Sequence, residues 1–227
     1  TNAIVGPAIT VGLAPAAMAI TPDGAQIYVI NYVDGNLGTG TISIINTRDN
    51  SVQLDVITGL SGPFAIAITP NGKYAYITNF GSNNFSPVGT TVSVVSIQSN
   101  TIVATITLGI QPSGVAITPD GAFAYVTNYS TVYNGPGFTI LTSAQGAVSV
   151  IDIKSNTVVD QVIGVGLSPA SITISPNGQF AYVTNYRSNT VSVIAVPSVL
   201  YDVNRLRPIY NLQLDETINK LNEAGLL

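Results

Sequence analysis

The sequence predicts an all-β fold, a β-propeller in which four blades of four antiparallel strands form a ring. The string FAYVTNY at 123–129 returns unchanged at 180–186, and near-copies occupy 26–32 and 74–80. Each copy follows a Thr/Ser-Pro-Asp/Asn-Gly turn, and the four turn prolines are 48, 49 and 57 residues apart. A repeat of this length with several β-branched runs is typical of a propeller rather than of a helical solenoid.

The unequal spacing comes from one variable loop, between the Tyr-Val-Thr-Asn string and the next alternating run. This loop has 8 residues at 33–40, 10 at 81–90, 17 at 130–146 and 3 at 187–189. Alternate connections of an up-and-down blade emerge on the same face of the ring, so all the length variation is expected on one face. Loops on such scaffolds commonly carry the binding function.

Each repeat unit predicts four short strands. The first is a run such as FAIAI at 64–68, followed by a type I turn with Pro at its second position and Gly at its fourth. The second strand is the AYVTN string, the third is a run such as TVSVI at 190–194, and the fourth is a run such as TIVATITLG at 101–109. We expect blades at about 16–59, 64–109, 113–166 and 170–196.

The two ends of the repeat region complement each other. Residues 1–12 match the fourth strand of a unit, whereas the last unit ends after its third strand, near residue 196. We therefore expect the N-terminal strand to complete the last blade and close a four-bladed ring over residues 1–198.

The strings ITPDG, AYVTNY, NTVSVI and NTVV resemble the YVTN β-propeller repeat of archaeal and bacterial surface-layer and other exported proteins. The likeness covers nearly all of residues 1–198. It implies a propeller and an extracytoplasmic location, secreted, periplasmic or on the cell surface. Relatives commonly close with about seven blades, so a fragment of a larger ring and a side-by-side dimer are alternatives to a four-bladed ring.

A different segment follows the repeats. Residues 199–227 are rich in charge, and Leu214, Ile218 and Leu221 recur at helical spacing, which predicts a short amphipathic helix at about 215–224. So short a helix needs a docking partner to be stable. It could dock on the propeller, mediate self-association with a second subunit, or begin a further domain.

The composition narrows the chemistry. The chain has no Cys and no His, so we expect no metal site, no cofactor and no imidazole-based triad, and we assign no catalytic residue. The net charge is −4 and only 8% of residues are charged, which argues against nucleic acid as a partner. No stretch is long and apolar enough to predict a membrane span.

The variable loops hold the candidate ligand-binding residues, because aromatic rings interleaved with amides suit sugars or peptides. These residues are Asp34, Asn36, Asn83, Asn84, Phe85, Tyr133, Asn134, Phe138 and Arg187. The spacing of Asp34 and Asn36 is seen in calcium loops, but the rest of that pattern is absent. A second interpretation is that these are ordinary solvated loops.

We therefore expect a non-enzymatic binding or surface-assembly module that recognises a glycan, a peptide or a protein through its long-loop face. One alternative is a propeller enzyme of the lactonase or lyase type that acts at the central channel. Another is a purely structural cell-surface spacer. The recurring Asn31, Asn79, Asn128 and Asn185 could form a ring of ligand contacts, although each could equally tie down the loop that follows it.

Overall fold

The computed structural model describes residues 2–32, 39–81, 88–109, 111–129, 133–134, 139–140 and 146–197. These residues form four antiparallel sheets and a two-stranded ribbon, and they contain no helix. The all-β architecture expected from the β-branched runs is therefore confirmed. Because no helix is found in this part of the chain, none there could cross a membrane.

The first two sheets each hold four strands that pair in sequence order. The strands of the first sheet are β1 (Pro15–Ile20), β2 (Gln26–Asn31), β3 (Thr39–Asn46) and β4 (Val52–Ser61). Those of the second sheet are β5 (Pro63–Ile68), β6 (Tyr74–Gly81), β7 (Val88–Ser96) and β8 (Thr101–Thr107).

The third sheet also has four strands, whereas the fourth has three. The strands of the third sheet are β9 (Pro112–Ile117), β10 (Phe123–Asn128), β13 (Gly146–Asp152) and β14 (Thr157–Val165). Those of the fourth are β15 (Pro169–Ile174), β16 (Phe180–Asn185) and β17 (Thr190–Ala195). A ribbon of β11 (Tyr133–Asn134) and β12 (Thr139–Ile140) lies between β10 and β13 in the chain.

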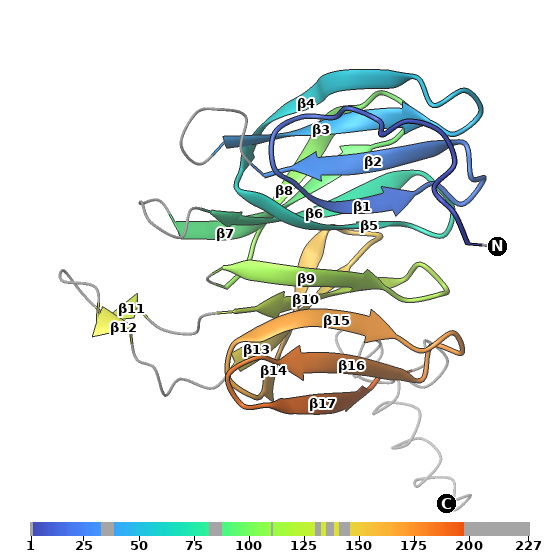
Figure 1. The fold of residues 1–227 in the computed structure, drawn as a ribbon. Helices are drawn as coiled ribbons and strands as arrows, with labels where there is room; N and C mark the ends of the chain where they lie inside the picture. Colours follow the sequence, from blue (N-terminus) through green and yellow to red (C-terminus); the bar gives the residue numbers. More distant parts are fainter. Residues whose placement is uncertain are drawn as a thin grey trace, which may run out of the picture.

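The four sheets follow one another in an open arc (Figure 1). Their inner strands are consecutive neighbours: β1 adjoins β5, β5 adjoins β9, and β9 adjoins β15. This radial stacking of up-and-down sheets is that of a β-propeller.

Apolar layers hold neighbouring sheets together. One face of each of the first three sheets carries a tyrosine and alternating aliphatic side chains, and it packs on the opposite face of the next sheet. The layer between the first and second sheets contains Tyr28, Ile30, Ile42 and Ile44 of one and Ala75, Ile77 and Val95 of the other. The same pattern recurs between the second and third sheets and between the third and fourth. Sequence repetition therefore serves packing, because each sheet must fit a copy of itself.

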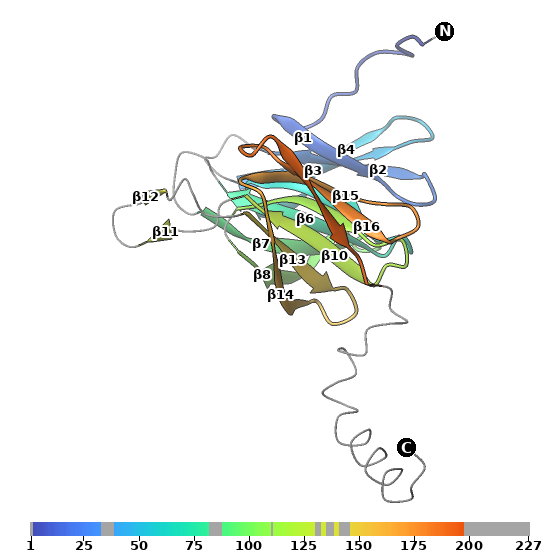
Figure 2. The same cartoon turned by 90° about the horizontal axis from the view of Figure 1, so that it is seen from below.

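The expected closure by the N-terminal strand is wrong. Residues 2–14 form no strand and pair with no part of β17, and Figure 2 shows this segment leading away from the sheets. The physical reason is the open arc: β1 and β15 lie at its opposite ends, so the residues before β1 are remote from the fourth sheet (Figure 1). A closed ring of four blades is thus not formed by the described residues, and the tail helix expected at 215–224 lies outside them.

Candidate active site

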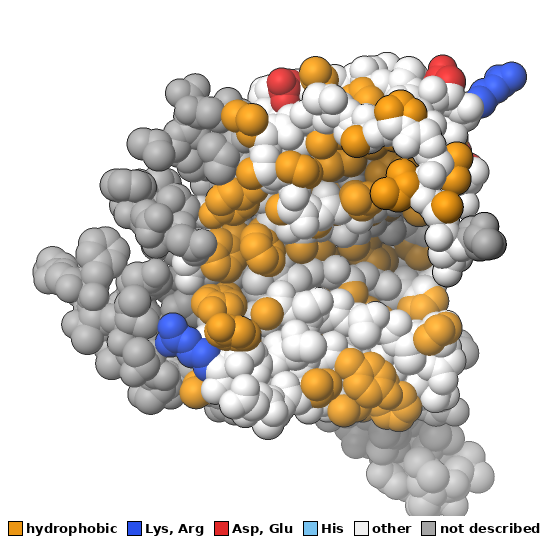
Figure 3. Space-filling model, viewed as in Figure 1, with side chains coloured by type: hydrophobic (Ala, Val, Ile, Leu, Met, Phe, Trp, Pro, Cys, Tyr) orange, Lys and Arg blue, Asp and Glu red, His pale blue; other side chains and the backbone are white. Residues whose placement is uncertain are grey.

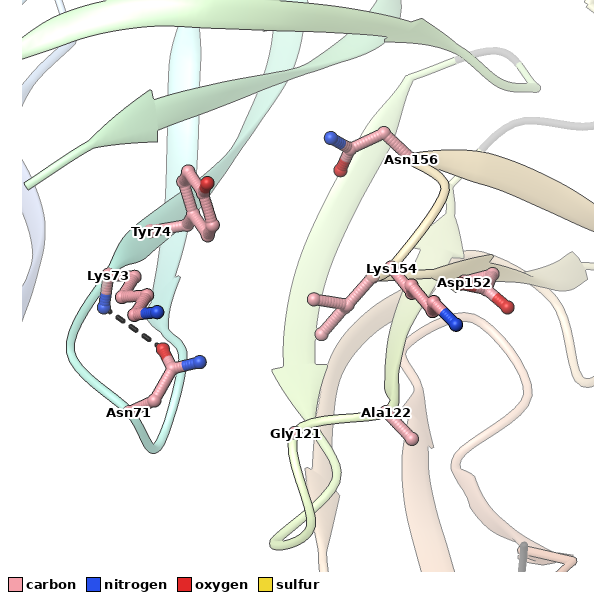
Figure 4. A pocket seen from close by; sticks show the side chains of 9 residues that line it. Asn71, Lys73, Tyr74, Gly121, Ala122, Asp152, Lys154 and Asn156 are labelled. Atoms are coloured by element: carbon pink, nitrogen blue, oxygen red, sulfur yellow. Dashed lines mark hydrogen bonds between the residues drawn. The ribbon is translucent and has the colours of Figure 1, made fainter.

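The turns between the first and second strands of each sheet share one hydrogen-bond pattern. In the second sheet Thr69 Oγ1 donates to Asn71 Oδ1 at 2.7 Å, and the same oxygen accepts the N–H of Lys73 at 3.0 Å. Gly72 completes the turn at a φ of 68°, a conformation that costs glycine little because it has no Cβ. This turn fixes the backbone of Lys73 at the boundary with the third sheet (Figure 4).

The turn between β13 and β14 provides the opposite wall. The N–H of Ser155 donates to Asp152 Oδ1 at 3.0 Å, and Asn156 adopts a left-handed φ of 54°. From the second sheet, the Tyr76 hydroxyl donates to Asn156 Oδ1 at 2.6 Å and ties the two sheets together. Burial raises the pKa of Tyr76 to about 12, with a smaller contribution from Tyr74, so the hydroxyl keeps its proton at neutral pH.

Between these walls lies a polar pocket of about 490 Å³. Figure 4 shows side chains of the second sheet on one side of it and those of the third sheet on the other. The lining residues are Asn71, Lys73, Tyr74, Gly121, Ala122, Asp152, Ile153, Lys154 and Asn156. The pocket therefore joins residues about 80 positions apart in the sequence, through the contact of two turns.

The pocket concentrates the charge of a weakly charged protein. In the described part of the chain the basic side chains are Arg48, Lys73, Lys154 and Arg187, and two of these four line this one pocket. Asp152 lines it as well. A carboxylate can accept a proton from water, and an ammonium group can stabilise a developing oxyanion or hold an anionic substituent. The described residues hold no group of three or more potential metal-ligating side chains.

A second, smaller cavity of about 210 Å³ lies at the other end of the strands. It is lined by Phe64, Phe80, Ser113, Tyr129 and Ala170. Phe80 contacts Phe64 with ring centroids 5.2 Å apart and Tyr129 with centroids 5.7 Å apart. The Ser113 hydroxyl is already engaged, since it donates to Pro169 O at 2.8 Å. This cavity offers stacking surface but no carboxylate.

The recurring asparagines do not form a ligand surface. Asn31, Asn79, Asn128 and Asn185 are buried. Each donates from Nδ2 to a serine hydroxyl of the third strand in its own sheet, at 2.8–2.9 Å. Each amide thus joins the second and third strands of its sheet at the base of the variable loop. This role is similar to the one expected from the sequence, in which each asparagine fastens the loop that follows it. Each leaves its buried Oδ1 without a hydrogen-bond partner.

Most sequence-predicted site residues lie outside the described residues. These are Asp34, Asn36, Asn83, Asn84, Phe85 and Phe138. Tyr133 and Asn134 form β11, and their side chains are not described. Arg187 is exposed, and its N–H donates to Leu167 O at 3.3 Å. Binding at these positions stays a prediction.

Sequence reasoning missed the polar pocket because its residues belong to turns whose composition is explained by turn chemistry alone. A signal was present. The turn that ends in Lys73 and the turn that follows Asp152 and contains Lys154 are expected on the same face of the ring. Their contact follows once neighbouring units are stacked.

Comparison with known proteins finds a lactonase family model and several solved propellers that resemble this chain. The family model "Lactonase, 7-bladed beta-propeller" matches residues 88–199. No curated protein matches the chain. Among solved structures, hydrazine synthase of Kuenenia stuttgartiensis is similar, with a TM-score of 0.59 and 25% identity over 86% of this chain and 53% of that one.

Two further solved structures are putative 6-phosphogluconolactonases. That of Bacteroides uniformis has a TM-score of 0.59 and 19% identity over 82% of this chain and 51% of that one. That of Bacteroides fragilis has a TM-score of 0.56 and 20% identity over 80% of this chain and 50% of that one. The chain thus spans about half the length of the structures it matches. Likenesses at 19% and 20% identity show the propeller fold alone.

These findings correct the functional expectation. The lactonase family match contradicts a non-enzymatic binding or surface-assembly module, and it favours the propeller enzyme that was the alternative. The expectation failed because the absence of His and Cys, which excludes imidazole-based triads and thiolate nucleophiles, was given too much weight against catalysis of every kind. Ester hydrolysis can instead rely on carboxylate and ammonium groups.

Proposed function

We propose that this chain is part of a lactonase-type propeller, an enzyme that opens a cyclic ester with water. The observation that carries the proposal is the family match over residues 88–199. That segment contributes Gly121, Ala122, Asp152, Lys154 and Asn156 to the polar pocket, which is therefore the preferred location for the reaction.

The chemistry needs two functions besides binding. A base must take a proton from the water that attacks the lactone carbonyl, and a donor must stabilise the oxyanion that forms. In the proposal Asp152 is the base, and Lys73 or Lys154 faces the oxyanion. The ring C–O bond then breaks, and the leaving alkoxide takes the proton from the carboxyl group. Lactone and water yield one hydroxy acid, so atoms and charge balance.

The aromatic cavity is a weaker candidate. Its lining contains a serine whose hydroxyl is engaged and a tyrosine, but no carboxylate or ammonium group that could activate water or hold an oxyanion. The polar pocket is also the larger of the two, at about 490 Å³, a size typical of small-molecule sites.

The test is hydrolysis of a panel of aliphatic and sugar δ-lactones, with and without a phosphate group. The reaction is monitored through the acid that hydrolysis releases. Asp152→Asn should lower kcat/KM by about 100-fold or more, because it removes the base. The fold should persist, since the amide oxygen can still accept the Ser155 N–H. Lys154→Met and Lys73→Met should each lower the rate of lactone hydrolysis. Comparison of the two variants separates the contributions of the two lysines.

Asp120→Asn is the matched control. Asp120 lies in the equivalent turn of the third sheet and accepts hydrogen bonds from Thr118 and Ala122, as Asn71 does from Thr69 and Lys73 in the second sheet. This variant should keep the parental rate. Hydrolysis no faster than in buffer for every lactone would refute the proposal. An equal loss of hydrolysis rate in Asp152→Asn and Asp120→Asn would show that the polar pocket is not the site of the reaction.

The proposal extends to the setting of the enzyme. The repeat strings resemble the YVTN type, and that resemblance supports an extracytoplasmic location and a ring with more blades than the four sheets that the described residues form. Detection of the native protein in the extracytoplasmic fraction, with a cytoplasmic marker as control, would support the location; recovery with the marker would contradict it.

A further inference from the structure

The small aromatic cavity lies where the inner strands begin. Phe64, Ser113 and Ala170 line it, and each is the second residue of an inner strand, β5, β9 or β15. Phe80 and Tyr129 complete the lining from the ends of the neighbouring strands β6 and β10. Figure 3 shows apolar side chains gathered over the beginnings of the inner strands, on the left of the view. The cavity is thus built by the stacking of the second, third and fourth sheets.

Strand pairing defines which positions of the sheets are equivalent here. Each inner strand begins with a proline that pairs with the recurring asparagine, as Pro63 pairs with Asn79. The next residue falls at an irregularity in the pairing. In chain order these residues are Ala16, Phe64, Ser113 and Ala170. A bulge redirects a side chain out of the regular ladder, and bulges are frequent beside functional sites.

Two aromatic residues of the second sheet depart from the repeat. Phe64 stands where the other sheets have alanine or serine. Phe80 follows the recurring asparagine, and the other sheets have tyrosine at that position. Packing of each sheet on a copy of itself explains the residues that recur, but not the residues that differ. Both departures line the same cavity, which indicates a role for the cavity beyond packing.

The first sheet shows what the usual tyrosine does. The Tyr32 hydroxyl donates to Gly81 O at 2.8 Å and joins the first sheet to the second. Phe80 has no hydroxyl and cannot make the equivalent bond. Its ring plane instead lies at 32° to that of Phe64 and at 65° to that of Tyr129. The three rings form a continuous aromatic row beside the cavity.

Phe64 is placed to offer its ring to a ligand. It is 41% exposed, although alanine is sufficient at the same position of the first and fourth sheets. A half-exposed ring gains little from folding, because much of its apolar surface stays in contact with water. Phe80 is 6% exposed and supports it. An exposed ring on a buried aromatic support is suited to stacking with another flat ring.

The lining decides the chemical class of the ligand. None of the five lining residues is charged or carries an amide. The Ser113 hydroxyl donates to Pro169 O and lies 2.8 Å from Thr127 Oγ1, so it has little capacity left for a ligand. A sugar would bring hydroxyl groups with too few partners, and an anion would lose its hydration without meeting a cation.

We propose that this cavity binds an uncharged aromatic compound of one or two fused rings, of the phenol or indole class, which stacks on Phe64 and Phe80. Such a ring needs no charged partner and gains tilted or edge contacts with the aromatic row. A volume of about 210 Å³ is sufficient, since smaller apolar cavities hold benzene. This site is separate from the polar pocket at the other end of the strands and does not depend on lactone hydrolysis.

The test measures binding of indole to the full chain. The chain has no Trp, so indole emission can be followed without interference from the protein. Indole should bind with a blue shift of its emission, because its ring leaves water. Phenol should displace it. Glucose and benzoate should not, because the first adds hydroxyl groups and the second adds a charge.

Three variants connect this binding to the cavity. Phe64→Ala introduces the residue of the first and fourth sheets, and it should weaken indole binding about tenfold. Ala170→Phe should also weaken binding, because the larger side chain fills the cavity. Phe180→Ala is the matched control, since Phe180 is likewise 41% exposed but does not line the cavity. This control should keep the parental affinity.

Absence of indole binding up to its solubility limit would overturn the proposal. So would parental affinity in both Phe64→Ala and Ala170→Phe, since ring stacking in this cavity predicts a loss in each. Displacement of indole by glucose as effective as that by phenol would overturn the aromatic assignment. Lactone hydrolysis does not enter these measurements, so this proposal and the proposed function can fail separately.

Discussion

The Tyr76 hydroxyl donates a 2.6 Å hydrogen bond to Asn156 Oδ1 across the boundary between the second and third sheets. Tyr76→Phe should lower the free energy of unfolding by about 1 kcal/mol, because one buried hydrogen bond is lost. Asn156→Gly keeps the left-handed turn while removing the acceptor. A double-mutant cycle of the two in urea should show coupling of about 1 kcal/mol, and additive effects would contradict a direct bond. Tyr186→Phe, at a residue 70% exposed, is the neutral control.

Alkaline pH should weaken the fold through the buried tyrosines. Burial raises the pKa of Tyr28 and Tyr76 from 10.0 to about 12, so the folded state holds these protons more tightly than the unfolded state. Their contribution is complete below pH 10 and is lost as the pH rises through about 12. Urea unfolding at pH 8 and pH 11 should show this loss. Tyr28→Phe should lose less stability between these pH values than the parent, and an equal loss would contradict the assignment.

A buried carboxylate should destabilise the protein at Asn79, one of the four recurring asparagines. Asn79 is 3% exposed, and its Nδ2 donates to the hydroxyls of Thr91 and Ser93 at 2.9 Å. Asn79→Asp should destabilise the protein by about 2 kcal/mol or more at neutral pH, because it places a charge in a site built for an amide. Below pH 4 the loss should shrink as the carboxyl gains a proton.

Asn177→Asp is the matched control for that change. Asn177 lies in an exposed turn whose equivalents in the first and third sheets are Asp23 and Asp120. A hydrogen bond from Thr21, with a second from the backbone of Ala25, lowers the pKa of Asp23, so a charged group is favoured at this position. Thermal unfolding should be unchanged by Asn177→Asp, and a large loss there would point to a general effect of added charge.

The inner strands of the third and fourth sheets approach closely at Gly114. A Cβ there would lie 2.9 Å from Ser171 Cα and 3.0 Å from Ile172 N, both backbone atoms of β15. Gly114→Ala should therefore cost about 1–3 kcal/mol through overpacking. Gly109→Ala should cost less, because its closest neighbour is the Asn128 side chain at 3.1 Å, which can shift. Equal melting temperatures of parent and Gly114→Ala would contradict this packing.

The sequence by itself determined the secondary structure and the repeat. Alternating β-branched residues specify strands locally, and the turn that begins at Thr118 closes through its own side chain, since Thr118 Oγ1 donates to Asp120 and accepts from Phe123 N. The stacking of sheets also follows from the repeat, because each of the first three copies of the string buries a tyrosine against the next sheet.

Only the tertiary structure decided whether the ring closes and where the charges meet. Curvature accumulates from small rotations between sheets, and no single repeat encodes their sum, so the remoteness of residues 2–11 from β17 could not be read from the matching patterns at the two ends. Lys73 and Asp152 line the same pocket only because the second and third sheets stack. Local patterns fix what each strand is, whereas the relative placement of sheets depends on packing summed over the whole arc.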